Sequence, residues 1–337
     1  MPPTCGARVL EADVEIDRRE FTIAVTLAVA PGERLALFGP SGSGKTTTLE
    51  TIAGLVAPRR GRVALAGRVL TQTWAPRHAV PPWRRGIGLL RQDPGLFPHL
   101  SIARNLRYGA GPQPDGEHLT RVATQLGIGG LLGSWPQEVS GGQAHRVALG
   151  RLLLARCDAL LLDEPYTGLD AGLRRDLTGL VRSAVTDREV PGVLVAHELA
   201  QAQAFADRLA VLDRGRILQC GPPDEVVRRP ASRRVAELVG YQGFVPVGAA
   251  GSVAGVHPER VAVGAEPGRG LVLTGRIMTC RPAGASWEAE VRTADGGDMR
   301  ILLPDRPEEG GGEFAITLLD PPCFGPDGVL LAHQVRA

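Results

Sequence analysis

The chain has 337 residues, room for roughly two domains, and its 43% hydrophobic and 22% charged residues exclude a disordered or fibrous protein. Lysine and arginine number 38 against 36 acidic residues, which argues against a nucleic-acid-coating surface and against a nucleic-acid partner. Five scattered cysteines without a CxxC pair argue against a disulfide framework or a zinc site, and favour a reducing, cytoplasmic compartment.

The first segment with a chemical signature is a glycine-rich turn between a predicted strand and a predicted helix. Residues 34–38 form a short apolar run typical of a buried strand, and residues 46–55 have helical spacing. The turn matches G-x-x-x-x-G-K-[ST], with Gly39, Pro40, Ser41, Gly42, Ser43, Gly44, Lys45 and Thr46, followed by Thr47. Free backbone N–H groups in such a turn converge on a phosphate at the helix N-terminus. We expect a nucleotide site in which Lys45 reaches the β- and γ-phosphates and Thr46 binds Mg²⁺, the alternative being a plain connector.

Lys45 is the only lysine of the chain, against 37 arginines. A mutational bias toward arginine that left one lysine by chance would explain this count. A position that needs a slim ammonium, where a planar guanidinium is too wide, explains it equally. The position of Lys45 in the glycine-rich turn favours the second explanation.

A second strand is predicted to supply carboxylates. The apolar run 159–162 ends in Asp163 and Glu164, and ligands of open parallel sheets bind at the carboxyl ends of the strands. We expect Asp163 to hold the Mg²⁺ shell through water and Glu164 to act as general base on the attacking water. The alternative is an acidic pair that merely caps the next helix.

A third motif points to a family. Residues Val139, Ser140, Gly141, Gly142 and Gln143 precede a predicted helix, and they resemble the LSGGQ signature of ATP-binding-cassette (ABC) ATPases, with valine in place of the usual leucine. A bare helix N-terminus after Ser140 could bind a phosphate. One subunit that already has a phosphate cradle has no use for a second one. Two facing subunits do, because each signature would then cover its partner's nucleotide.

The remaining motifs follow in the order typical of this family. Gln92, after the run 87–90, resembles the Q-loop glutamine, which contacts Mg²⁺ and the water. Residues 167–170 resemble the D-loop and end in Asp170, and His197 resembles the switch histidine that contacts the γ-phosphate. The resemblance covers residues 8–230. Only Phe21 is a candidate for stacking on adenine, and its alternation with Ile23 and Val25 predicts that it faces the core instead.

The resemblance implies a fold and an activity. We expect an α/β P-loop ATPase domain with a helical subdomain over residues 1–235, which binds ATP and Mg²⁺ and works as a homodimer. Residues 95–109 resemble a segment of bacterial importers, especially those for molybdate and related oxyanions, where a permease helix docks. Phe97 and Leu100 are therefore either permease contacts or core residues of the helical subdomain.

After about residue 236 the helical periodicity gives way to short alternating runs at 260–263, 270–278, 287–291, 299–303 and 313–319, separated by turns such as 295–297 and 310–312. This pattern predicts a small β-barrel over residues 236–337. The run 256–261 resembles the entry to the regulatory TOBE domain of importer ATPases. Where molybdate-type barrels often carry a Ser-x-Arg-Asn segment, this chain has Glu266, Pro267, Gly268, Arg269 and Gly270, so anion binding by the barrel stays open.

No segment is predicted to cross a membrane. Residues 1–6 lack the pattern of a signal peptide, and the longest run without Asp, Glu, Lys or Arg, 238–258, is interrupted by glycines and prolines. That run predicts a linker with short strands.

These expectations combine into a peripheral ATPase subunit on the cytoplasmic face of the membrane, with a permease and a separate substrate-binding protein as partners. The predicted substrate is an oxyanion such as molybdate, sulfate or tungstate. An importer of iron(III), a polyamine or a sugar, and a soluble ABC ATPase without a transport role, remain the alternatives.

Overall fold

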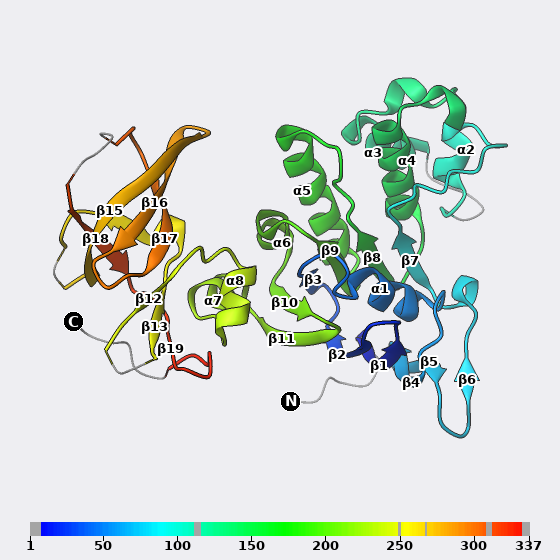
Figure 1. The fold of residues 1–337 in the computed structure, drawn as a ribbon. Helices are drawn as coiled ribbons and strands as arrows, with labels where there is room; N and C mark the ends of the chain where they lie inside the picture. Colours follow the sequence, from blue (N-terminus) through cyan, green and yellow to red (C-terminus); the bar gives the residue numbers. More distant parts are fainter. Residues whose placement is uncertain (1–7, 111–115, 249–250, 267, 308–311, 332–337) are drawn as a thin grey trace. The chain divides into compact units, whose positions relative to one another are not determined.

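The computed structural model describes residues 8–110, 116–248, 251–266, 268–307 and 312–331. The chain divides into two compact units, Met1–Pro223 and Asp224–Ala337 (Figure 1). The predicted boundary at 235/236 stays a prediction, since it rests on the change of sequence pattern. Residues 1–6, Pro267, Gly310 and Gly311, which also entered the sequence-based predictions, lie outside the described residues.

The first unit is built on a sheet that has eleven strands in the described part of the chain, in the order β6-β5-β4-β1-β2-β11-β10-β3-β9-β8-β7. Its strands are β1 Leu10–Asp17, β2 Thr22–Val29, β3 Arg34–Phe38, β4 Arg60–Leu65, β5 Arg68–Gln72, β6 His78–Ala79, β7 Ile87–Leu90, β8 Ala159–Asp163, β9 Gly192–Ala196, β10 Arg208–Asp213 and β11 Arg216–Gly221. Neighbours among β10, β3, β9, β8 and β7 run parallel, whereas β1 pairs antiparallel with β2 and β4. The carboxyl ends of the parallel strands therefore meet at one edge.

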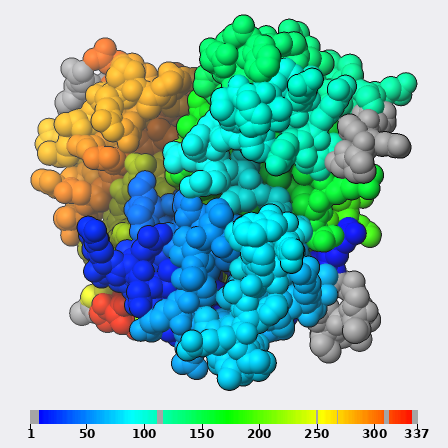
Figure 2. Space-filling model, turned by 90° about the vertical axis from the view of Figure 1, so that its right-hand side faces the viewer, coloured from blue at the N-terminus to red at the C-terminus, as the bar shows by residue number. Residues whose placement is uncertain are grey.

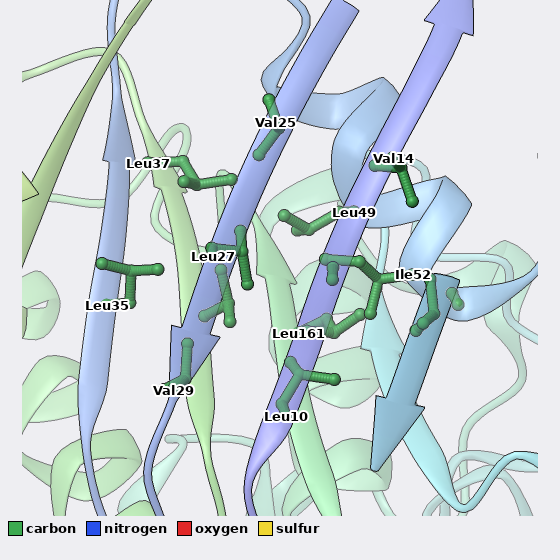
Figure 3. Close-up of a cluster of buried hydrophobic side chains, with 14 of the residues drawn as sticks. Leu10, Val14, Val25, Leu27, Val29, Leu35, Leu37, Leu49, Ile52 and Leu161 are labelled. Carbon is green, nitrogen blue, oxygen red and sulfur yellow. The ribbon is translucent and has the colours of Figure 1, made fainter. Parts of the chain in front are cut away.

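The burial of each strand follows its place in the sheet. Strand β1 alternates buried and exposed residues, as expected for a strand with one solvated face, whereas every residue of β8 and β9 is buried. Leu49 and Ile52 of helix α1 (Lys45–Ala53) pack against this sheet in the main core cluster, beside Leu161 of β8 (Figure 3). The packing anchors the first helix after the glycine-rich turn directly over the sheet.

The other helices of the first unit are α2 Ile102–Arg107, α3 Gly116–Gln125, α4 Gly141–Leu154, α5 Ala171–Asp187 and α6 Leu199–Phe205, with 3-10 turns at Pro82–Arg84, Gly129–Leu131 and Pro136–Glu138. Helices α2 and α3 both pack on α4 and form the expected helical subdomain (Figure 1). Gly150 allows this close approach, because a Cβ there would lie 2.7 Å from both Leu106 and Leu126. Among the described helices, none combines the length and the apolar content that crossing a membrane would require.

The second unit is mainly antiparallel. Helix α7 Pro223–Arg228 begins at the last residue of the first unit and continues into the second. The second unit further contains α8 Arg233–Leu238, the 3-10 turn Pro258–Arg260, β12 Phe244–Pro246, β13 Val253–Gly255, β14 Val261–Val263, β15 Gly270–Ala283, β16 Ser286–Thr293, β17 Asp298–Leu303, β18 Phe314–Leu319 and β19 Cys323–Phe324. A sheet in the order β14-β18-β15-β16-β17 and a smaller sheet β12-β13-β19 bury their apolar faces in one shared core. The predicted fold class, a P-loop α/β domain followed by a small barrel-like β domain, is confirmed.

Candidate nucleotide-binding site

A cavity of about 760 Å³ opens at the carboxyl ends of the parallel strands of the first unit. Its lining comes from five separate segments: the turn between β1 and β2 with the start of β2, the glycine-rich turn with the start of α1, Gln92 after β7, Glu164 after β8, and His197 after β9. The lining residues are Arg18, Arg19, Glu20, Phe21, Ile23, Ser41, Gly42, Gly44, Lys45, Thr46, Thr47, Gln92, Glu164 and His197. The sheet thus brings half of the predicted site residues into one cavity lining.

The glycine-rich turn adopts a conformation that its glycines make possible. Gly44 has φ +107°, and a Cβ at this position would lie 2.8 Å from Ile23. Gly39 lies so close to strand β10 that a Cβ would be 2.0 Å from the carbonyl oxygen of Leu212. Both positions require a residue without a side chain, so the glycines of the motif are explained by backbone conformation and close packing.

Lys45 lies beneath this turn and is only 6% exposed. Its Nζ donates hydrogen bonds to the carbonyl oxygens of Gly39 and Pro40, each at 2.8 Å. Burial lowers the pKa of this ammonium, while the nearby carboxylates of Glu164 and Asp163 act in the opposite direction. The side chain is held by these two backbone carbonyl groups, each of which accepts one hydrogen bond from the ammonium.

Two of the three predicted magnesium ligands, Thr46 and Asp163, are in contact with each other. The Thr46 hydroxyl donates a hydrogen bond to Oδ1 of Asp163 at 3.0 Å, although the two residues are far apart in the sequence. Asp163 is 5% exposed, and burial raises the pKa of its carboxyl, partly offset by the Thr46 hydrogen bond. A hydroxyl and a carboxylate at the edge of a phosphate cradle are hard oxygen donors of the kind that Mg²⁺ prefers. The residues present therefore fit a magnesium–nucleotide complex.

The two predicted catalytic residues after β8 and β9 are also adjacent. Nδ1 of His197 lies 3.5 Å from Oε2 of Glu164. Glu164 has φ +50°, an unusual backbone conformation for a residue with a side chain, and such positions cluster at functional sites. Its backbone N–H is held by the carbonyl of Val195 at 3.2 Å. This conformation turns the chain sharply at the end of β8, where Glu164 lines the cavity.

The turn between β1 and β2 contributes residues that sequence reasoning missed. Arg18 donates a hydrogen bond to the hydroxyl of Thr47, and Arg18, Arg19 and Glu20 line the cavity next to the start of α1. Phe21 packs against the main core, as its alternation predicts, and also lines the cavity. The only feature of the sequence that could have pointed to them is the pair of consecutive arginines directly after the first strand. Their spacing along the chain does not place them beside the glycine-rich turn.

The signature residues are not part of this cavity lining. Ser140 caps helix α4: its hydroxyl accepts from the N–H of Gln143 at 3.3 Å, and Oε1 of Gln143 accepts from the N–H of Ser140 at 2.8 Å. This capping box accounts for the serine and for the glutamine. It leaves the two glycines without a structural reason, because a Cβ at Gly141 or Gly142 would meet nothing within 4 Å.

Asp170 has a comparable local role. It caps helix α5 by accepting a hydrogen bond from the N–H of Leu173 at 3.0 Å, and this bond holds the pKa of its carboxyl below the ordinary value. Like Ser140, Asp170 lies on a helix N-terminus outside the lining of the cavity.

Comparison with known proteins decides the family. A family model described as ABC transporter matches residues 23–167, and one described as TOBE domain matches residues 254–316. An "Fe(3+) ions import ATP-binding protein FbpC" of Pseudomonas fluorescens is 36% identical over 308 residues, which are 84% of this chain and 86% of that protein. The chain belongs to the ATP-binding subunits of ABC importers.

Further relatives of this ABC subunit differ in their named substrates. A "Sulfate/thiosulfate import ATP-binding protein CysA 2" of Chromobacterium violaceum is 42% identical over 225 residues, covering 66% of this chain and 60% of that protein. Among solved structures, a bacterial Atm1-family ABC exporter with ATP bound is similar with a TM-score of 0.59 at 25% identity, covering 70% of this chain and 42% of that one.

Membership of this family establishes the activity and the cofactors of the chain. The ABC subunit is an ATPase, and its family uses ATP with Mg²⁺ and couples hydrolysis to transport. The predicted ABC importer subunit with a C-terminal TOBE domain is therefore confirmed. The preference for molybdate is not supported by these relatives, whose names specify iron(III) and sulfate or thiosulfate.

Proposed function

We propose that ATP is hydrolysed in the 760 Å³ cavity of the first unit, by residues that the sheet brings together from separate segments. This proposal rests on one observation: Lys45, Glu164 and His197 line the same cavity. The backbone N–H groups of residues 41, 42 and 44–46, which are free within the described residues, would bind the β- and γ-phosphates at the N-terminus of α1. Side chains of Ser41, Ser43 and Thr47 would complete the cradle. Lys45 would add a point charge beside the transferred phosphoryl group.

Magnesium would be held by Thr46, by Asp163 through water, and by Gln92, and when bound it would neutralise charge that develops on the phosphate oxygens. Glu164 would accept the proton of the attacking water as general base. His197, 3.5 Å from Glu164, would fix the orientation of that carboxylate and reach the γ-phosphate. The left-handed backbone of Glu164 supports this assignment, because strain at a cavity wall is typical of positions that the reaction needs.

We infer that two copies of the chain face each other. Gly141 and Gly142 have open space around them, and within the described residues their N–H groups at the start of α4 have no hydrogen-bond acceptor. A γ-phosphate from a second copy would supply one. Asp170 lies on the N-terminus of α5, where it could contact the same interface. The homodimer would thus contain two composite ATP sites.

The transport partners are a membrane-integral permease and a separate substrate-binding protein, and the subunit would bind the permease at the cytoplasmic face of the membrane. Residues 95–109 are the proposed docking segment. Phe97 is partly used inside the chain, since its ring lies 4.3 Å from that of Tyr108 and the Arg151 guanidinium lies 5.2 Å from its centre. Tyr108 remains exposed and Leu100 half-buried, so these two side chains are the better candidates for contact.

Ferric iron is the proposed substrate. A relative that matches 84% of this chain is an Fe(3+) ions import ATP-binding protein by its name. A sulfate or related oxyanion is the second candidate, because the sulfate/thiosulfate relative has the higher identity over a shorter region. In the second unit, Arg269 does not support an anion site, since its guanidinium is paired with Glu266 at 2.7 Å.

The test is uptake by a strain that lacks the gene, complemented with the wild-type chain or with Glu164→Gln. Radiolabelled iron(III), sulfate and molybdate are supplied separately. We expect that only iron uptake depends on the wild-type chain and that Glu164→Gln does not restore it. Restoration of sulfate or molybdate uptake instead would replace iron as the substrate, and uptake of all three without the chain would refute an import role for these solutes.

A further inference from the structure

An acid-free stretch of the first unit carries an unusual concentration of arginine and tryptophan. Residues 51–92 contain no aspartate or glutamate, although the whole chain has nearly equal numbers of acidic and basic residues. Two of the four tryptophans, Trp74 and Trp83, lie here. The arginines of this stretch are Arg59, Arg60, Arg62, Arg68, Arg77, Arg84, Arg85 and Arg91.

Half of these arginines are accounted for by the fold. Arg59, Arg62 and Arg91 pair with Glu15, Glu11 and Glu50 at 2.7, 3.4 and 3.2 Å. Arg85 is buried. The other four are exposed, and in the part of the chain that the structure describes none of them forms an ion pair with a carboxylate. These four are Arg60, Arg68, Arg77 and Arg84.

Three of the unpaired arginines lie with both tryptophans on one edge of the large sheet. Strand β6 is the edge strand, and its hairpin with β5 extends away from the body of the first unit (Figure 1). We call the residues that surround this hairpin the aromatic–basic edge: Arg68, Trp74, Arg77, Trp83 and Arg84. The same segment, coloured light blue to cyan, stands at the surface in Figure 2.

Hydrogen bonds group the aromatic–basic edge into two clusters. Arg68 at the start of β5 donates to the carbonyl of Arg84 at 3.3 Å, which holds β5 next to the 3-10 turn that carries Trp83. At the other end of the hairpin, Nε of Arg77 donates to the carbonyl of Thr73 at 3.2 Å, next to Trp74. One end of the hairpin therefore carries Trp83 with Arg68 and Arg84, and the other end carries Trp74 with Arg77.

The exposed indole rings of Trp74 and Trp83 are available to bind a partner. Trp83 is 82% exposed and Trp74 47%, and an indole has a large apolar body with one polar N–H. Such rings favour the interface between lipid headgroups and acyl chains. Arginines beside them are attracted to anionic headgroups, each by about fivefold in affinity. Stable contact with a membrane generally takes two such signals together, and this edge supplies both.

We propose that the aromatic–basic edge binds the anionic headgroup surface of the membrane on which the transporter works. This proposal rests on the proposed peripheral location of the subunit. Single-stranded nucleic acid would also suit arginine and tryptophan, but it is bound in grooves that follow its backbone. The two clusters instead lie at opposite ends of a projecting two-stranded hairpin, a shape that fits a broad surface.

The test measures co-sedimentation of the purified full-length chain with vesicles. The vesicles consist of phosphatidylcholine alone or of phosphatidylcholine mixed with phosphatidylglycerol. We expect binding to the anionic vesicles only, and its loss between about 0.1 M and ~1 M salt. Arg68→Gln, Arg77→Gln and Arg84→Gln combined should weaken binding by about 100-fold, and Trp74→Ser with Trp83→Ser by at least about tenfold.

Controls separate this contact from other effects. Trp135→Ser removes an exposed indole outside this edge and should leave vesicle binding unchanged. ATP hydrolysis and the thermal unfolding midpoint are measured on every variant, so that loss of vesicle binding with hydrolysis retained is distinct from failure of the ATPase assignment. Equal binding by wild type and both edge variants, or equal binding to neutral vesicles, would overturn the proposal. So would tighter binding of a fluorescent oligonucleotide than of anionic vesicles.

Discussion

Arg85 offers a sharp test of how the ATPase unit is held together. Its side chain is 5% exposed and, among the described residues, forms no ion pair. Nε donates to the carbonyl of Val80 at 2.9 Å, Nη1 to that of Ile52 at 2.8 Å, and Nη2 to the hydroxyl of Thr71 at 2.8 Å. Ile52 lies in the last turn of α1, so this cation also faces the negative end of the helix dipole. Burial lowers the pKa of the guanidinium.

Arg85→Leu removes all of these bonds. Hydrogen bonds to a charged group contribute about 1.5–3 kcal/mol each, so three sum to roughly 4.5–9 kcal/mol. The loss is partly offset because an ion in a buried site carries a desolvation penalty of several kcal/mol. We expect a net destabilisation of about 3 kcal/mol, since three buried acceptors are left without donors. For a domain of this size, that lowers the unfolding midpoint by about 6–12 °C.

The assay is thermal unfolding of the purified chain followed by calorimetry, with Arg84→Leu as the matched control. Arg84 is the neighbouring residue and its side chain is exposed, so its replacement should shift the midpoint by less than about 2 °C. If Arg85→Leu unfolds within that same range, the desolvation of the guanidinium cancels its hydrogen bonds, and the role we assign to Arg85 in securing α1 is refuted.

Four further outcomes are expected. Glu164→Gln should keep its affinity for a fluorescent ATP analogue but lose ~100-fold or more of steady-state turnover, and near-normal turnover would remove Glu164 as general base. Lys45→Arg should abolish ATP binding or turnover, because the ammonium is enclosed by two carbonyl groups at 2.8 Å; wild-type kinetics would mean that the sole lysine is an accident of composition. Each of the variants Ser140→Arg and Lys45→Ala should lose ATP hydrolysis as a homodimer. Mixing the two chains should restore part of the hydrolysis, because one composite site of the mixed dimer is then intact. No recovery in confirmed mixed dimers would contradict facing subunits. Burial lowers the pKa of His145 below its ordinary 6.5, so the unfolded state takes up the proton first as the pH falls. The free energy of unfolding should therefore decrease below about pH 6.5. The unfolding midpoint of His145→Gln should depend less on pH in this range, and an unchanged pH dependence would exclude His145 as its cause.

Much of the site could be predicted from sequence because its elements are local. The phosphate cradle is eight consecutive residues between a strand and a helix, and its glycines are required by backbone conformation and close packing at that turn. The alternation of Phe21, Ile23 and Val25 predicted one buried face, and the continuous apolar run 159–162 predicted a buried strand, as β2 and β8 have. The order of the motifs identified the family, in agreement with the comparisons.

The tertiary structure decided the contacts between segments that are far apart in the sequence. The hydroxyl of Thr46 meets Asp163, and Arg18 meets Thr47, only because β3 and β8 flank β9 and because β1 and β2 lie in the same sheet. Residue spacing along the chain carries no information about that strand order. Nor does it show that Arg85 turns inward to α1 while Arg84 stays exposed. These outcomes depend on which strands pair and on the free energy of burying each side chain against its actual neighbours, and both are set by the fold as a whole.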